Sequence, residues 1–134
     1  MADIFKVEII TPDRIFYEGE AHFIEFTTAA GEIGVFANHI PMTTVLAPGV
    51  VTIYNGEEET VAAVHAGFAE ILGDKVTLLA EVAEWPDEID VNRAEAAKDR
   101  AEARIANKSS DIDIVRAELA LRKALTRIDL AGYR

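Results

Sequence analysis

The chain has 134 residues, half of them hydrophobic, and a formal net charge of −11 at pH 7. This length and composition predict one folded domain, or a domain with an appendage, and they exclude a disordered chain. The absence of cysteine excludes a disulfide scaffold, a thiolate zinc site and a cysteine nucleophile.

Charge is divided unevenly along the chain. Residues 1–88 carry three basic side chains against sixteen acidic ones, whereas residues 89–134 carry ten basic against eight acidic. The acidic first part argues against binding to nucleic acid or to anionic lipid headgroups, because both need cationic partners. The longest apolar runs are far shorter than the ~20 residues of a membrane span. The first residues lack the basic, apolar pattern of a leader, so we expect the chain to stay where it is made.

Up to residue 84 the sequence predicts short strands. Phe5, Val7 and Ile9 alternate with charged residues, which is the period-two pattern of a half-buried strand. Asn55-Gly56 predicts a hairpin with a type I′ turn. Turn signals recur every 8–12 residues or so, a spacing typical of an all-β sandwich or barrel. The strand-like runs are residues 5–9, 15–17, 23–27, 42–46, 50–54, 60–65, 68–72 and 76–81.

Residues 31–42, GEIGVFANHIPM, are predicted to form a shaped loop. Two glycines stand three positions apart, His-Ile-Pro lies near the end, and only short apolar pieces come between them. Glycine permits positive φ and close backbone approach, and proline fixes φ. Exposed loops on a rigid scaffold often make a protein's contacts. The segment is therefore a candidate binding loop, and the alternative is a plain connection.

From Ile89 onward the pattern changes to Ala, Glu, Lys and Arg, with no glycine before Gly132. It predicts one helix over residues 91–107, capped by Asp90, and a second over residues 112–130. The break between them is short, so the two helices should be antiparallel neighbours. The first helix offers mostly alanine to their seam, which buries little apolar area. The hairpin should therefore need to dock on the sandwich.

Basic side chains line one face of each predicted helix when residues are placed at 100° intervals. Arginine forks on two antiparallel helices can converge on a polyanionic phosphate. Glu84 and Asp90 can accept hydrogen bonds from an adenine amino group or ribose hydroxyls. The alternative is a solvated face with partners at i,i+3 and i,i+4. The two stripes are Arg93, Arg100 and Arg104, and Arg116, Lys123 and Arg127.

No pattern typical of catalysis or metal binding occurs. His22, His39 and His65 are 17 and 26 positions apart, so no HxH or HExxH pair exists. The chain also lacks GxSxG, GxxxxGK[ST] and GxGxxG. We expect no catalytic residue, no metal and no required cofactor. A small β-sandwich hydrolase or isomerase is the enzymatic alternative.

Four segments together resemble the epsilon subunit of bacterial F-type ATP synthase. They are GEIGVFANHIPM, LAPG, AGFAEILGDKVTLLAEVAE and IDVNRA, and they occur in the family's order over essentially the whole chain. The resemblance implies an α+β fold, with a ten-stranded antiparallel β-sandwich over residues 1–86 and an antiparallel α-helical hairpin over residues 87–134. It implies a non-catalytic central-stalk subunit that couples rotation to proton-driven ATP synthesis.

The resemblance also implies partners. Glu32 would face the c-ring and His39 the gamma subunit. The hairpin would fold onto the sandwich or extend along gamma toward the alpha and beta subunits, where it inhibits ATP hydrolysis. The subunit would lie peripherally at the cytoplasmic face of the bacterial cell membrane, without inserting into it.

In some members of this family the folded hairpin binds ATP through an I/L-D-x-x-R-A motif, which residues 89–94 match. ATP would then be a regulatory ligand, and a subunit that mainly reports the ATP level is the alternative function. Lys123 stands where ATP-binding members carry arginine. The nucleotide site that the resemblance implies consists of Glu84, Asp90, Arg93, Arg100, Lys123 and Arg127.

Overall fold

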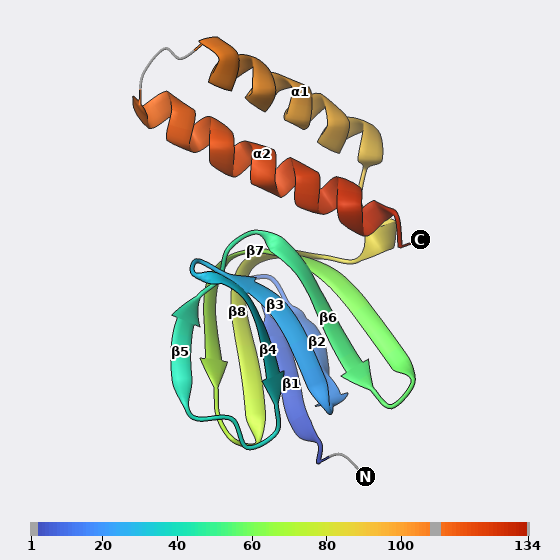
Figure 1. Cartoon of the computed structure of the whole chain (residues 1–134). Helices are drawn as coiled ribbons and strands as arrows, with labels where there is room; N and C mark the ends of the chain where they lie inside the picture. Colours follow the sequence, from blue (N-terminus) through green and yellow to red (C-terminus); the bar gives the residue numbers. More distant parts are fainter. Residues whose placement is uncertain (1–2, 108–110, 134) are drawn as a thin grey trace.

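The computed structural model describes residues 3–107 and 111–133, and it has the α+β fold that the sequence predicts. The strands are β1 (Phe5–Ile10), β2 (Ile15–Ala21), β3 (Phe23–Thr28), β4 (Gly31–Phe36), β5 (Met42–Val45), β6 (Gly49–Asn55), β7 (Glu58–Ile71) and β8 (Lys75–Glu84). The helices are the 3-10 helix η1 (Pro86–Glu88), α1 (Val91–Asn107) and α2 (Asp111–Ala131). Figure 1 shows both α-helices at one end of the strands, with α2 nearer to them.

A long bent strand, β7, joins the two layers of strands. The order is β2-β1-β8-β7-β6-β3-β4, and β5 pairs with β7 as well. The first half of β7 pairs with β6, and its second half pairs with β5. Between the halves, Ala66 and Gly67 have φ values of 58° and 119°. This positive-φ pair bends the strand while its pairing with β8 continues on both sides.

The sheet differs from the one that the resemblance implies in strand number and in direction. The resemblance implies ten antiparallel strands, whereas the described residues form eight, and one of them, β7, passes through the bend and takes part in both layers. The runs predicted at 60–65 and 68–72 are thus one strand. In addition, β1 and β8 pair in parallel. Parallel neighbours need a long crossover, and nearly the whole sandwich lies between these two strands.

The expectation of a loop at residues 31–42 was wrong for its first half. Gly31–Phe36 is β4, which pairs with β3 so that Val35 lies opposite Ile24 in the core. At Gly34 an added Cβ would lie 2.6 Å from Cζ of Phe23, so this glycine makes room for an aromatic ring. Gly34 of the pattern that suggested a loop therefore reflects packing within a hairpin, whereas Gly31 has a φ of 126° beside the turn between β3 and β4.

The β6–β7 hairpin also differs from its prediction in turn type. Asn55 pairs with Glu58, so Gly56 and Glu57 are the central residues. Among the described non-glycine residues only Asn38 and Ala66 have positive φ, and Gly56 has a φ of 63°. A type I′ turn needs positive φ at both central residues, so this turn is not of that type.

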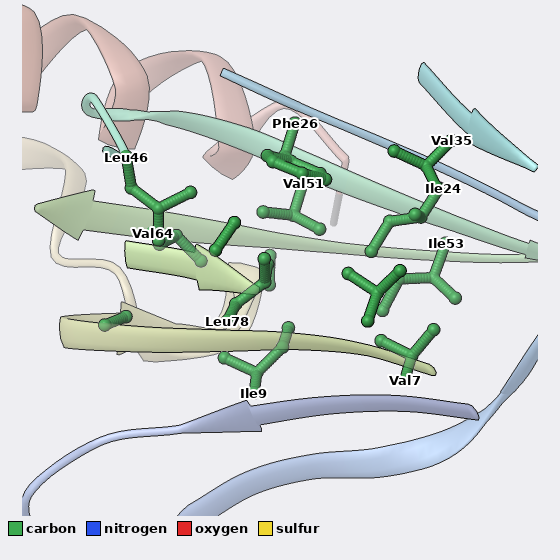
Figure 2. Close-up of a cluster of buried hydrophobic side chains, with 14 of the residues drawn as sticks. Val7, Ile9, Ile24, Phe26, Val35, Leu46, Val51, Ile53, Val64 and Leu78 are labelled. Carbon is green, nitrogen blue, oxygen red and sulfur yellow. The ribbon is translucent and has the colours of Figure 1, made fainter. Parts of the chain in front are cut away.

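The main core lies between the two layers of strands. Alternate residues of the strands point inward, so large aliphatic and aromatic side chains meet there. Figure 2 shows ten labelled members of this cluster approaching one another from several strands. They are Val7, Ile9, Ile24, Phe26, Val35, Leu46, Val51, Ile53, Val64 and Leu78.

The helical hairpin rests on a much smaller apolar cluster. Ala63 of β7, Ile89 and Leu130 of α2 are buried together, with partly buried neighbours around them. The first helix buries alanine at the seam between the helices, as the sequence predicts, and the second helix buries alanine there too. The buried side chains are Ala94, Ala101, Ala117 and Ala124. Alanine burial contributes little free energy. The hairpin is therefore held to the sandwich by few apolar contacts.

Helix bounds agree closely with the prediction. The first helix has the predicted bounds, and the second extends one residue further at each end, from Asp111 to Ala131. Most of the predicted break, residues 108–110, lies outside the described residues. Among the described helices, none is both long and apolar enough to cross a membrane.

The segment that connects the sandwich to the helical hairpin packs against β2 and its start. Trp85 stacks on Phe16 with ring centroids 4.1 Å apart, and Nη2 of Arg14 lies 3.0 Å from both carboxylate oxygens of Glu88. The guanidinium of Arg14 also lies 5.0 Å from the Phe16 ring centroid. Residues 85–88 thus belong to the sandwich side, and the hairpin leaves it at Ile89.

We expect the chain shortened to residues 1–88 to unfold in one cooperative transition. The main core and the stacking of Trp85 on Phe16 both remain, whereas only the small docking cluster is lost. Thermal unfolding followed by circular dichroism, with the full chain as control, measures this. A broad melt without a cooperative transition would show that the helices complete the core.

Candidate functional site: a polar pocket beneath the hairpin

A pocket of about 280 Å³ lies where α1, α2 and the end of β8 meet. Its lining combines carboxylates, guanidiniums and two alanines. Five of the six residues that the resemblance assigns to a nucleotide site are among them. The lining residues are Glu84, Glu88, Asp90, Arg93, Ala94, Ala97, Arg100 and Arg127.

Asp90 fixes the start of α1 and thereby the position of two arginines. Its Oδ1 accepts the backbone N–H of Arg93 at 3.1 Å, and its carbonyl accepts the N–H of Ala94 at 3.0 Å. This is the N-cap arrangement that the sequence predicts. From that start, Arg93, Ala97 and Arg100 follow at i, i+4 and i+7 and share the face that lines the pocket.

Glu84 connects the sandwich to the second helix. It ends β8 opposite Ala63 of β7. Its Oε1 accepts a hydrogen bond from Nε of Arg127 at 2.7 Å, and the same oxygen lies 3.1 Å from Nε2 of His65. One carboxylate oxygen thus binds side chains from β7 and α2.

The environment of Glu84 favours its ionised form. Burial by itself would raise the pKa of this carboxyl, but hydrogen bonds from His65 and Arg127 together hold the pKa below its usual 4.5. The three carboxylates and three guanidiniums of the lining give it no net formal charge. Among the described residues, the guanidiniums of Arg93 and Arg100 make no ion pair, so their donors remain open to a ligand.

The structure does not bring Lys123 into the pocket. It precedes Arg127 by one turn of α2 and is partly exposed. Arg104 and Arg116, the other members of the predicted stripes, are exposed and also lie outside the lining. Docking of α2 therefore directs only one cation of its stripe toward the pocket.

Glu32 and His39, the predicted interface residues, lie apart at opposite ends of β4. Glu32 is exposed beside the turn from β3. His39 follows the strand, next to Asn38, whose amide donates to Asp3 at 3.4 Å. The two residues therefore belong to different ends of the sandwich.

Sequence reasoning missed two residues of this region. Glu88 lines the pocket, and His65, whose spacing from the other histidines argues against a metal site, contacts Glu84. The one available signal was a lone histidine in an apolar strand, two positions after Ala63. Within the part of the chain that the structure describes, no group of three or more His, Asp or Glu side chains is placed to hold a metal ion.

We expect Glu84→Gln to lower the free energy of unfolding at pH 7 by about 1–2 kcal/mol, because it removes a charge-assisted hydrogen bond. A folded-state pKa below 4.5 means that this stabilisation is complete above pH 4.5 and is lost as the pH falls through the folded value. The variant and the parent should therefore converge in stability as the pH falls below this folded-state pKa. Urea unfolding at pH 7 and at acidic pH, followed by the circular dichroism of the helices, measures this. An equal deficit at both would contradict the ionic role.

Comparison with known proteins agrees with the resemblance drawn from the residues. A family model described as ATP synthase, Delta/Epsilon chain, beta-sandwich domain matches residues 4–86, and one for the long alpha-helix domain of the same chain matches residues 87–132. The ATP synthase epsilon chain of Caldanaerobacter subterraneus subsp. tengcongensis is 43% identical over 132 residues, covering 98% of this chain and 96% of its own. That of Shouchella clausii is 47% identical over 130 residues, covering 96% of each.

Among solved structures, a chain of the Euglena gracilis mitochondrial ATP synthase, described with OSCP, F1 and the c-ring, matches with a TM-score of 0.80. Its sequence is 22% identical, and the match covers 97% of this chain and 81% of that one, which shows that the fold is shared. The sandwich-then-helices architecture and the resemblance are both confirmed. The chain belongs to the ATP synthase delta/epsilon family.

Proposed function

We propose that the protein is the epsilon subunit of an F-type ATP synthase, a non-catalytic part of the central stalk that binds the gamma subunit and the c-ring. The observation that carries the proposal is similarity over nearly the whole length to proteins named ATP synthase epsilon chain. The subunit then lies peripherally at the cytoplasmic face of a bacterial membrane. Co-purification of the tagged chain with gamma and the c-ring tests the proposal.

The sandwich, residues 1–86, carries the stalk contacts in this proposal. Phe36, Ile40 and Met42 are exposed on both sides of His39, at 62%, 79% and 39%. Exposed apolar side chains that cluster in this way mark protein contacts. We assign gamma to the end of the sandwich near His39 and the c-ring to the end near Glu32.

The hairpin, residues 87–134, carries regulation. It inhibits ATP hydrolysis by leaving the sandwich and extending along gamma toward the alpha and beta subunits. The small docking cluster and the alanine seam support this role, because an element held by few apolar contacts is released at low cost. Residues 89–134 carry ten basic against eight acidic side chains, a balance that suits acidic surfaces.

ATP is the regulatory ligand we propose for the pocket, and no cofactor is required. Open guanidinium forks at Arg93 and Arg100 suit phosphate oxygens, and the carboxylates of Glu84 and Asp90 suit amino and hydroxyl donors. The neutral lining and a volume just below the usual range of about 300–1,000 Å³ predict weak binding. Binding should favour the docked hairpin, because both helices line the pocket.

Calorimetric titration with ATP should show weak binding, and Lys123→Arg should leave it unchanged, because Lys123 lies outside the lining of the pocket. Arg93→Ala should abolish binding, because it removes a guanidinium from the lining. Arg104→Ala is the matched control: it removes the same charge from α1 outside the pocket and should bind like the parent. The absence of heat at several millimolar ATP would overturn the ligand assignment and leave the stalk role untouched.

A further inference from the structure

A buried histidine stands behind the pocket. His65 of β7 is only 1% exposed, and its Nε2 lies 3.1 Å from Oε1 of Glu84. His65 is not part of the pocket lining. Its other ring nitrogen, Nδ1, is buried and has no hydrogen-bond partner among the described residues.

These contacts define the tautomer of the ring. An ionised carboxylate can only accept hydrogen bonds, so Nε2 of His65 carries the hydrogen that Oε1 of Glu84 accepts. Nδ1 is then a bare acceptor in the neutral ring. A hydrogen on Nδ1 would be a buried donor without an acceptor, which is costly.

The same carboxylate oxygen accepts Nε of Arg127 at 2.7 Å, so three side chains from β7, β8 and α2 meet at one atom. Glu84 has a flexible side chain, whereas His65 is fixed by burial in a paired strand. We propose that His65 is the positioning residue of a latch, His65–Glu84–Arg127, which holds α2 against the sandwich.

The latch matters because the rest of the docking surface is small. Beyond Ala63, Ile89 and Leu130, the apolar cluster has only partly buried members. A hydrogen-bonded carboxylate with a defined orientation therefore contributes a substantial share of the docking free energy. This role concerns docking alone and does not depend on nucleotide binding.

Two variants of the full chain separate positioning from space filling. His65→Gln keeps an N–H donor near the place of Nε2, and His65→Leu has a similar volume without a donor. Hydrogen exchange of α2 amides at pH 7 measures docking, and amides of β1 and β2 report on the sandwich. We expect His65→Leu to speed α2 exchange about tenfold and His65→Gln to stay within about twofold of the parent.

A double-mutant cycle with Glu84→Gln completes the test. If the latch exists, His65→Leu should add little to the effect of Glu84→Gln, because the shared contact is already weakened. Equal acceleration by His65→Leu and His65→Gln, additive effects in the cycle, or parent-like exchange in His65→Leu would each overturn the proposal. If His65→Leu fails to fold, a double-mutant cycle of Arg127→Gln and Glu84→Gln decides whether Oε1 of Glu84 couples α2 to the sandwich.

Discussion

Removing residues 89–134 is expected to raise ATP hydrolysis by the assembled complex by at least about fivefold, the lower end of usual regulatory coupling. The stacked Trp85 and the Arg14–Glu88 pair end the sandwich side at residue 88, so the cut leaves the proposed stalk contacts in place. Assembly should therefore remain intact. ATPase assays of complexes carrying residues 1–134 or 1–88 measure the effect.

A variant that keeps the hairpin but weakens its docking is the matched comparison for the deletion. Arg127→Ala removes the hydrogen bond between α2 and Glu84 and keeps both helices, so it should shift the hairpin toward the extended, inhibitory form. Hydrolysis should then fall below that of the parent, opposite in direction to the deletion. If deletion leaves hydrolysis unchanged, the hairpin is not an inhibitor in this complex.

Gly67→Ala should be the most damaging single substitution on the sandwich side, at about 3 kcal/mol or more. Gly67 has a φ of 119°. An added Cβ would collide with the carbonyl oxygen of Leu79 and would lie 2.9 Å from its carbonyl carbon and 3.0 Å from Cα of Ala80. Both obstacles are backbone of β8, so relief requires the bend in β7 to move.

Gly31→Ala is the control that separates strain from collision. Gly31 has a similar φ of 126°, but nothing lies within 4 Å of the added Cβ. It should cost only the conformational strain, about 1–2 kcal/mol. Urea unfolding of the two variants measures the difference. Equal losses of unfolding free energy would mean that the backbone at Leu79 moves aside at little cost.

Local features of the fold could be predicted from the sequence. The bounds of α1 follow from helix-forming residues and from Asp90 as its cap, both of which act within a few positions. The strand β4 was missed because the space that Gly34 leaves for Phe23 is visible only when β3 and β4 are paired. The joining of two predicted runs into β7 was missed for a similar reason, since the pairing with β8 carries the strand past Ala66.

The candidate site could likewise be predicted only where it depends on residues close together in the sequence. Helical spacing alone placed Arg93 and Arg100 on one face, which lines the pocket. Spacing also grouped Lys123 with Arg127, but in the docked helix α2 only Arg127 lines the pocket. The orientation of α2 is set by its contacts with β6 and β7, which helical spacing does not reveal. The contact of Glu84 with His65 depends on strand register, which pairs Ala63 with Glu84 across 21 positions of sequence.

In the proposed function, the sandwich places this chain in the rotary stalk and the hairpin is a separate, regulatory part. The most direct measurement is binding of residues 1–134 and of residues 1–88 to a purified gamma–c-ring complex by surface plasmon resonance. Both forms should bind, with affinities within about tenfold of each other. Loss of binding on removal of the hairpin, or no binding by either form, would contradict the proposed function.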